Sequence, residues 1–260
     1  MSATPISRVR ILPNYLGGFL YAWDVSGEFD DPAPWRFVVQ KGHTNDGPWE
    51  DLSPELVNVV SWRDEGGKHL YGKTNVLYFR VVLRTPNGEY ASAPVQPYGD
   101  LSRREFLLAR EIMRREALSA RLLSGVECDV YVKSTFGPRC TFCIDPVTGD
   151  VRDSHCKKCF GTGRYPAYFG PHRMMVSFTP DSAHAKANAN DGTHEQRQFE
   201  ATAIGNPVLK KGDVVVDVAR DKRYVVGTAS VTSEVRRIPC LQKLVFSEAP
   251  LSDPVYRIGA

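Results

Sequence analysis

Cys140-Thr-Phe-Cys143 and Cys156-Lys-Lys-Cys159 are the two stretches that decide how the middle of this chain folds. In each, two residues separate a pair of cysteines, a spacing at which one tight turn aims two thiolates at the same ion. Four thiolates complete the closed tetrahedral shell of a structural zinc site. The sequence therefore predicts a bound Zn²⁺ with Cys140, Cys143, Cys156 and Cys159 as its ligands.

Other uses of these cysteines are open from the sequence. They could be buried thiols or disulfide partners, although four of the chain's six cysteines are crowded into this one segment. His155 and His172 flank the segment, and either could replace one cysteine as a ligand. Because four cysteines already close the shell, we expect a structural site without the open position that catalysis needs. Cys128 and Cys240 stand apart, beside β-type residues, and we expect both to be small buried side chains rather than a disulfide or a nucleophile.

The segment between the pairs, Ile144-Asp-Pro-Val-Thr-Gly149-Asp150, is rich in turn-forming residues and predicts a hairpin tip between two metal-binding turns. It offers almost no apolar side chains to bury, so its folding free energy has to come largely from the metal. The second pair continues as Cys159-Phe-Gly161-Thr-Gly163 and resembles one half-repeat of the cysteine-rich domain of DnaJ-type chaperones. That resemblance supports zinc and implies no chaperone activity.

The composition of the chain limits the class of protein and the partners to expect. The chain has 260 residues, 42% of them hydrophobic and 24% charged, as in soluble globular proteins with two or three small domains. A net charge of +3 is too small to imply nucleic acid by itself. We find no run of about 18 apolar residues that would span a bilayer, and Met1-Ser-Ala-Thr-Pro lacks the features of a signal peptide. We expect no membrane partner and synthesis in a cytoplasm.

Residues 1–99 predict an all-β sandwich. Short apolar segments alternate with Pro, Gly and Asn-Gly at the spacing typical of such folds. The expected strands are Arg8–Leu12, Phe19–Val25, Trp35–Lys41, Leu56–Trp62, Val76–Arg84 and Tyr90–Pro94. Asn87-Gly88 predicts a tight hairpin turn in which both residues have positive φ.

The same region resembles a fibronectin type III module. The matching residues are Tyr21 and Trp23 on an early strand, Trp49 and Leu52 in the middle, Leu77-Tyr-Phe79-Arg-Val81, and the Ser92-Ala-Pro94 exit. The resemblance implies a β-sandwich that binds proteins or separates surfaces, with no catalytic residues. Trp35, Trp49 and Trp62 could form a stacking platform for a ligand, but we favour packing in the core.

Residues 100–125 predict a connecting helix. Ser102-Arg-Arg-Glu105 has the spacing of a capping box, and Phe106, Ala109, Ile112/Met113, Ala117 and Ala120 recur at helical spacing before Ser124-Gly125 ends it. Arginines and glutamates cover the other face, where a solvated surface with i to i+4 ion pairs is favoured over a nucleic-acid contact. A length of about 30 Å suits a connector or an oligomer interface.

The remaining chain predicts three parts: a strand with the four-cysteine zinc module at 126–180, a flexible loop at 181–198, and a small β-barrel-like domain at 199–260. Strands are expected at Val126–Ser134, Tyr165–Tyr168, Met174–Thr179, Phe199–Ile204, Asp213–Val218, Arg223–Ala229, Glu234–Ile238 and Leu241–Ser247, with a hairpin turn near Ala219–Lys222. The loop has little to bury, so we expect His184 and His194 to be exposed rather than ligands. The fold class is thus mainly β with one long helix.

The last third resembles neck proteins of tailed bacteriophages, which join capsid to tail. The matching residues are Gly212-Asp213, Arg223-Tyr224-Val225-Val226 and Leu241-Gln242-Lys-Leu244. The resemblance implies a virion structural protein of the neck, head-tail connector or tail region. Such a protein would be made in the host cytoplasm, with copies of itself and other virion subunits as partners.

A second function stays open. The zinc segment could act as a zinc-ribbon nucleic-acid-binding protein, with basic side chains around the metal: Arg139, Arg152, Lys157, Lys158, Arg164 and Arg173. Asp145, Asp150 and Asp153 interrupt that basic set, so nucleic acid is the second choice. Gly-x-Ser-x-Gly, Gly-x4-Gly-Lys and His-Glu-x2-His motifs do not occur, and we expect no enzymatic activity.

Overall fold

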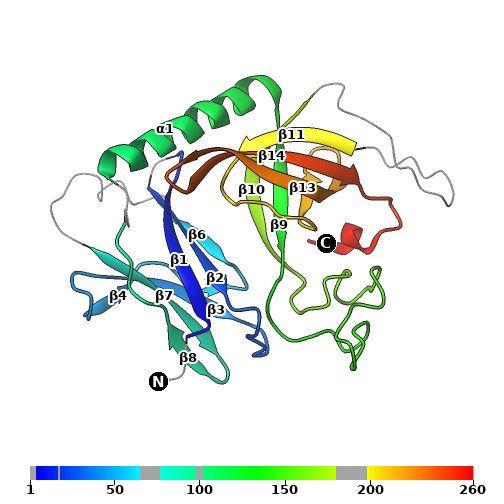
Figure 1. Cartoon of the computed structure of the whole chain (residues 1–260), viewed down its shortest axis with the longest axis horizontal. Helices are drawn as coiled ribbons and strands as arrows, with labels where there is room; N and C mark the ends of the chain where they lie inside the picture. Colours follow the sequence, from blue (N-terminus) through cyan, green and yellow to red (C-terminus); the bar gives the residue numbers. More distant parts are fainter. Residues whose placement is uncertain (1–3, 17, 65–76, 98–101, 180–197, 260) are drawn as a thin grey trace.

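A computed structural model describes residues 4–16, 18–64, 77–97, 102–179 and 198–259 (Figure 1). The chain is mainly β, with antiparallel sheets at the N-terminal end, one long helix across the top and a closed barrel at the C-terminal end. Of the expected loop at 181–198, all but Gln198 lies outside the described residues. No helix among those residues is both long and apolar enough to cross a membrane.

Two antiparallel sheets make up the N-terminal part. The first has the order β1-β2-β6, and the second has the order β4-β3-β7-β8, with β5 also paired to β3. Their strands are β1 (Ile6–Pro13), β2 (Phe19–Val25), β3 (Arg36–Gly42), β4 (Trp49–Asp51), β5 (Leu56–Val57), β6 (Ser61–Asp64), β7 (Tyr78–Thr85) and β8 (Gly88–Ala91). Strand β2 alternates buried and half-buried residues, as its sequence predicts. The sheets pack through aromatic rings: Trp23 lies 5.2 Å from Phe37 and Tyr21 lies 5.3 Å from Phe79, between centroids.

One of the strands predicted in this part is divided in the structure. The single strand predicted at Leu56–Trp62 is divided between β5 and β6, which belong to different sheets. The chain crosses over at Asn58, whose φ is +51° and whose side-chain oxygen accepts a hydrogen bond from the Trp35 amide at 2.9 Å. An asparagine tolerates this left-handed backbone, which breaks the strand.

The hairpin predicted after Val81 is confirmed, but its turn geometry was wrong. Thr85 pairs with Gly88, so Pro86 and Asn87 form the turn, and neither Asn87 nor Gly88 has a positive φ. Proline at the first central position favours the common type I turn, which needs no positive φ. The Thr85 hydroxyl holds the turn by accepting hydrogen bonds from the amides of Asn87 and Gly88, each at 3.2 Å.

The helix begins and ends as predicted. Helix α1 (Arg103–Ser119) continues as one π-helical turn (Ala120–Ser124), and Ser102 and Glu105 form the expected capping box. Its buried face is made of Phe106, Ala109, Met113 and Ala117. This face packs on β1 of the first sheet and on β11, β13 and β14 of the barrel, so the helix joins the two halves of the molecule (Figure 1).

Six strands close the barrel in the order β10-β11-β14-β13-β12-β9. They are β9 (Gly125–Lys133), β10 (Tyr168–Phe178), β11 (Gln198–Ile204), β12 (Val214–Asp217), β13 (Lys222–Val235) and β14 (Ile238–Glu248). The barrel is therefore not confined to residues 199–260. Two of its strands, β9 and β10, come from the segment on either side of the cysteines. Its core is apolar, and Val130, Val176, Leu244 and Phe246 are fully buried.

Strand β13 covers the strand predicted at Arg223–Ala229 and continues to Val235, into the start of the strand predicted at Glu234–Ile238. Register shifts after Val226 and Val231 let this long strand curve around the barrel without ending. The turn to β14 falls at Arg236 and Arg237, inside the second predicted strand, and both have positive φ (+42° and +72°). Arginines carry no turn signal, and that is why a strand was expected there.

Candidate metal centre

The cysteine segment is an insertion between two neighbouring barrel strands. Strands β9 and β10 pair with each other up to Lys133 and Tyr168, and the Ser134 amide then donates to the Ala167 carbonyl at 2.9 Å. Residues 134–167, which we call the cysteine module, thus leave and re-enter the barrel at one point (Figure 1). The strand pairing holds the two ends of this long loop together.

Four thiols meet inside the module. Cys140, Cys143, Cys156 and Cys159 are at most 6% exposed, and their sulfur atoms all lie within 4.8 Å of one another. The Sγ atoms of Cys143 and Cys159 are 3.3 Å apart, and those of Cys140 and Cys156 are 4.0 Å apart. Zinc–sulfur bonds of about 2.3 Å in a tetrahedron place the sulfur atoms about 3.8 Å from one another. All six cysteines of the chain are free thiols, so the cluster has the size of a metal shell rather than of disulfides.

The backbone forms a tight turn at each cysteine pair. The Ile144 amide donates to the Cys140 carbonyl at 3.3 Å, and the Phe160 amide donates to the Cys156 carbonyl at 2.7 Å. Gly161 has a φ of +75°, and a β-carbon there would lie 2.2 Å from the Ser154 carbonyl oxygen. Only glycine fits such a position, so Gly161 serves the turn that follows Cys159.

Four ionised thiols cannot lie this close together unless a cation balances their negative charge. Burial and the neighbouring thiols raise the pKa of Cys143 far above its usual range, and burial also raises the pKa of Cys159. Burial opposes ionisation of Cys140 too, but hydrogen bonds from the Tyr165 hydroxyl and from nearby backbone amides outweigh it and lower the pKa to about 6. One thiolate therefore forms readily. The full set fits a metal ion such as Zn²⁺, which when bound supplies the positive charge that lets all four ionise.

Tyr165 is a member of the site that sequence reasoning missed. Its hydroxyl lies 3.3 Å from the Cys140 sulfur, while the Gly163 amide donates to the Cys159 sulfur at the same distance. Hydrogen bonds to ligand sulfurs of this kind orient the ligands and tune the metal. The only sequence signal for Tyr165 is its place two residues after Gly163, which is too weak to predict such a contact.

The predicted hairpin tip is present. Ile144 and Val151 form an isolated antiparallel bridge, and the Asp145 amide donates to the Asp150 carbonyl at 2.9 Å. The Asp145 carboxylate accepts the Val147 amide at 2.8 Å and pairs with Arg152. The hydrogen bond from the Val147 amide is the main cause that lowers the pKa of Asp145, and the side chain of Arg152 lowers it further. The tip is therefore held by polar contacts and exposes Val147 to solvent.

An aromatic cluster fixes the module to the rest of the protein. Phe136 at its entrance stacks on Phe169 of β10, with ring centroids 5.0 Å apart, and lies 4.7 Å from Trp35 of the N-terminal part. The Gly137 amide donates to the Phe29 carbonyl at 2.7 Å. Because Trp35 is fully buried, it packs in the core as favoured above and is closed to a ligand.

The flanking histidines do not join the thiols. In the part of the chain that the structure describes, the cluster of metal-binding groups at this site consists of the four cysteines. His155 is exposed in the module, and His172 pairs with Val130 in the barrel wall. Cys128 and Cys240 are buried and free in the barrel core, as expected, and burial raises the pKa of Cys128 to about 12.

Three of the six basic side chains proposed for nucleic acid are engaged within the protein. Arg152 pairs with Asp145, the Arg164 guanidinium donates to the Gly137 carbonyl at 2.8 Å, and Arg173 pairs with Asp129. Lys158 lies over the ring of Phe142, 5.3 Å from its centroid. The basic residues therefore do not present one uninterrupted cationic surface around the cysteines.

Comparison with known proteins adds no relative to this picture: the sequence matches no protein-family model and no curated protein. Four buried, unlinked thiols at metal spacing, braced by amides and by Tyr165, make a closed centre that could hold a metal ion such as zinc.

Proposed function

We propose that this chain is a structural assembly protein of a tailed-bacteriophage virion, located in the neck, connector or tail region. It acts through contacts with copies of itself and with other virion subunits, and one structural Zn²⁺ shapes its cysteine module. The observation that carries the proposal is the form of this module. Its thiols are closed off from solvent, yet Phe142 and Val147 on its outside are 71% and 90% exposed. A closed centre with an exposed apolar tip suits contact with another subunit rather than chemistry at the metal.

The barrel supports the resemblance to neck proteins at fold level. The polar residues that carry this resemblance are buried and tie loops to the barrel. The Asp213 carboxylate accepts the amides of Lys133 at 2.8 Å and Lys210 at 2.7 Å. The Gln242 amide group donates to the carbonyls of Ile204 at 2.7 Å and Pro207 at 2.8 Å. Such buried hydrogen bonds fix the shape of a subunit that must fit its neighbours.

Further exposed apolar side chains favour assembly. Leu108, Leu122 and Leu123 of the helix region are 52%, 76% and 84% exposed. The two N-terminal sheets, three strands facing a larger sheet, fit the fibronectin type III-like module that the sequence resembles. We infer that these surfaces, together with the module tip, are covered by partner subunits in the particle.

The alternative function, a zinc-ribbon nucleic-acid-binding protein, has less support. Phosphate binding needs several free cations along one track, and Arg152, Arg164 and Arg173 are held by contacts within the protein. We therefore place nucleic acid second.

Electron microscopy of the native particle tests the proposed function. We expect the chain at one fixed position in the neck or tail, in a defined number of copies, with the module tip against a neighbouring subunit. Purified protein should form rings or other defined complexes whose size is insensitive to added DNA. A monomer that is absent from particles and binds DNA with a steep salt dependence would contradict the proposal.

A further inference from the structure

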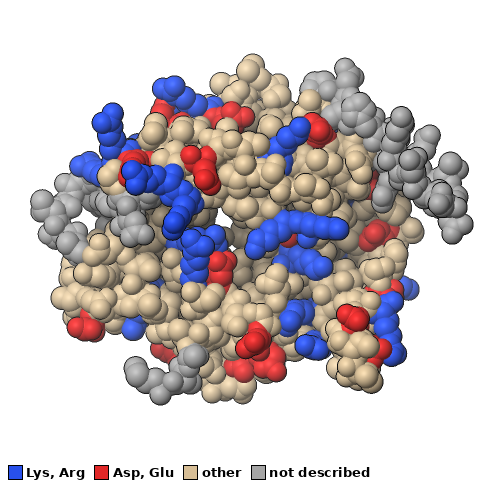
Figure 2. Space-filling view, in the orientation of Figure 1, with Lys and Arg blue, Asp and Glu red and all other residues tan. Residues whose placement is uncertain are grey.

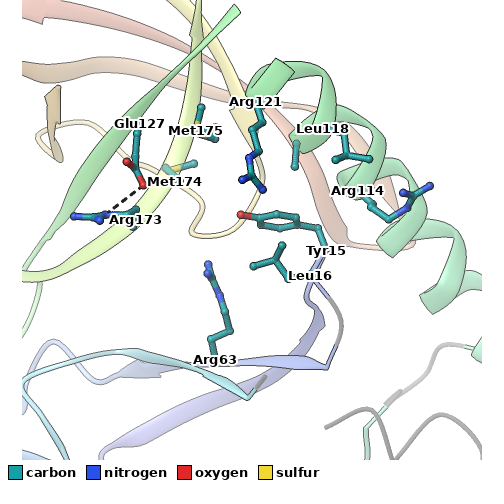
Figure 3. A pocket seen from close by; sticks show the side chains of 11 residues that line it. Tyr15, Leu16, Arg63, Arg114, Leu118, Arg121, Glu127, Arg173, Met174 and Met175 are labelled. Carbon is teal, nitrogen blue, oxygen red and sulfur yellow. Dashed lines mark ion pairs between the residues drawn. The ribbon is translucent and has the colours of Figure 1, made fainter. Parts of the chain in front are cut away.

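A cavity of about 730 Å³ lies where the three parts of the molecule meet. The turn between β1 and β2 and strand β6 form one side, the helix forms the roof, and β9 and β10 form the far wall (Figure 3). Figure 2 shows basic side chains gathered around a hollow in the middle of this face, below the helix. None of the residues that line the cavity comes from the cysteine module, so this site is separate from the thiol cluster.

Four arginines line the cavity, and they differ in their partners. Arg114 is paired with Glu111 at 2.8 Å, and Arg173 is paired with Asp129 at 3.0 Å, so the charges of both are balanced. Among the described residues, no carboxylate forms an ion pair with Arg63 or Arg121. Arg121 reaches down from the end of the helix and Arg63 reaches up from β6, toward the same space (Figure 3). Within the described residues, two guanidinium groups without a carboxylate partner thus point into one cavity, and Arg63 also lies over the Tyr15 ring, 5.9 Å from its centroid.

The walls between these arginines are apolar. Leu16 and Leu118 are 57% and 41% exposed at the cavity, Met174 and Met175 lie on its β10 side, and the Tyr15 ring lies beneath Arg121 (Figure 3). Methionine side chains adapt to different apolar partners and are common at binding surfaces. A ligand that fits must therefore carry both negative charge and an apolar group.

The shape and charge distinguish between classes of anion. A nucleic-acid strand needs cations spread along its phosphates. Here two arginines without a carboxylate partner among the described residues converge, and Glu127, which also lines the cavity, is paired with Arg173 at 3.7 Å. Guanidinium groups match the planar geometry of a carboxylate, which accepts two parallel hydrogen bonds from one arginine. The volume suits a short peptide segment.

We propose that this cavity, the arginine cavity, binds a short acidic segment of a partner polypeptide. A carboxylate of that segment pairs with Arg63 and Arg121, and a neighbouring apolar side chain packs against Leu16, Leu118 and Met175. This inference adds the chemistry of the partner to the assembly function proposed above. It rests on that function for one point, that the partner is a protein.

Selection from a random dodecapeptide library on the immobilised full chain tests this proposal. We expect enrichment of peptides that combine Asp or Glu with Leu or Phe. The best synthetic peptide, measured by fluorescence anisotropy, should bind the Arg63→Gln/Arg121→Gln variant at least about tenfold more weakly. The matched control, Arg104→Gln/Arg115→Gln, removes two exposed arginines of the same helix and should bind as the wild type does.

A charge swap guards against a folding artefact. The Arg63→Glu/Arg121→Glu variant should reject the acidic peptide and bind the same peptide with its acidic residues replaced by Lys. Failure to select any peptide whose binding depends on Arg63 and Arg121 would overturn the proposal. So would tighter binding of a labelled single-stranded oligonucleotide that is lost in the Gln variant. If the chain binds such a peptide but microscopy finds it in no particle, the virion function is contradicted and peptide binding in the arginine cavity is supported.

Discussion

The cysteine module and the barrel are neighbours in the chain, yet different forces hold them. The barrel buries a continuous set of apolar side chains, including Val130, Val176 and Phe246, and its strands close on themselves. Beyond Phe136 at its base, the outer part of the module is built around the four buried cysteines, with Ile144 and Tyr165 partly buried against them. One part of this protein is thus stabilised by removing apolar surface from water, whereas the other has little apolar surface to bury and would depend on a metal ion held by its thiols.

The two regions meet at the aromatic cluster of Trp35, Phe136 and Phe169. These rings belong to the large apolar core that also contains the N-terminal sheets, the helix and the barrel. The base of the module is therefore held by apolar packing, while its outer part depends on the thiols. Changes at the metal should stay local, whereas changes at the base should spread through the whole core.

The largest expected effect is at the metal. Cys143→Ser should abolish zinc binding, because three thiolates with a hydroxyl do not complete the shell, and apparent binding free energies of such sites are about 10 to 16 kcal/mol. Zinc content should fall from about one per chain to none, and limited proteolysis should cut within residues 134–167. Cys240→Ala, a buried thiol in the barrel, is the control and should keep its zinc. A zinc-free Cys143→Ser protein that resists protease in the module would contradict the metal's structural role.

The next effect is at the base. Phe169→Ala removes a fully buried ring from the shared core and should lower the free energy of unfolding by about 3 to 5 kcal/mol. Urea denaturation should show the main transition of the N-terminal part and the barrel shifted as a whole. Phe142→Ala, at an exposed ring of the module, should leave that transition almost unchanged. Equal effects of the two substitutions would remove the distinction between base and tip.

A smaller effect concerns pH. Burial, and then the charge of Arg63, lower the pKa of His172 to about 4, whereas the unfolded chain keeps a value near 6.5. The unfolded state thus binds more protons between these values, and the stability that neutral His172 supports is lost as pH falls from about 6.5 to 4. We expect a loss of about 1 to 3 kcal/mol.

His172→Gln should remove this loss, and the wild-type-minus-variant difference in unfolding free energy across pH isolates it. The difference is needed because burial raises the pKa of Asp213 to about 6, which stabilises the fold as pH falls below that value. His155→Gln, at an exposed histidine of the module, should keep the wild-type pH profile. An identical profile for His172→Gln and wild type would exclude His172 as the source.

The smallest effect is at the helix cap. Ser102 accepts the Glu105 amide at 3.3 Å, and Ser102→Ala should cost about 1 kcal/mol of stability. Ser119→Ala, at an exposed site near the other end of the helix, is the control and should change stability by less. Thermal unfolding measures both. A Ser102→Ala loss no larger than that of the control would show that the cap adds nothing.

The sequence predicted what depends on neighbouring residues. The two Cys-x2-Cys spacings predict the cluster of four thiols, the capping box predicts the start of the helix, and alternation predicts the exact bounds of the strand Phe19–Val25. Each of these signals is contained within a few positions of the chain.

Features that depend on distant residues were not predictable. The pairing of β9 with β12 and of β10 with β11 makes both strands part of the barrel, and nothing in their own sequences names those partners. The arginine cavity joins Arg63 to Arg121 across separate elements. The Arg236-Arg237 turn was missed because neither residue favours positive φ on its own.

Hydrogen exchange of the intact reduced protein, with and without a zinc chelator, tests the central claim most directly. We expect chelation to remove protection from amides around the thiols, such as those of Phe160 and Gly163, while amides of β9, β11 and β14 keep theirs. Unchanged protection in the module, or equal loss in module and barrel, would contradict the claim that the metal holds one region and the apolar core holds the other.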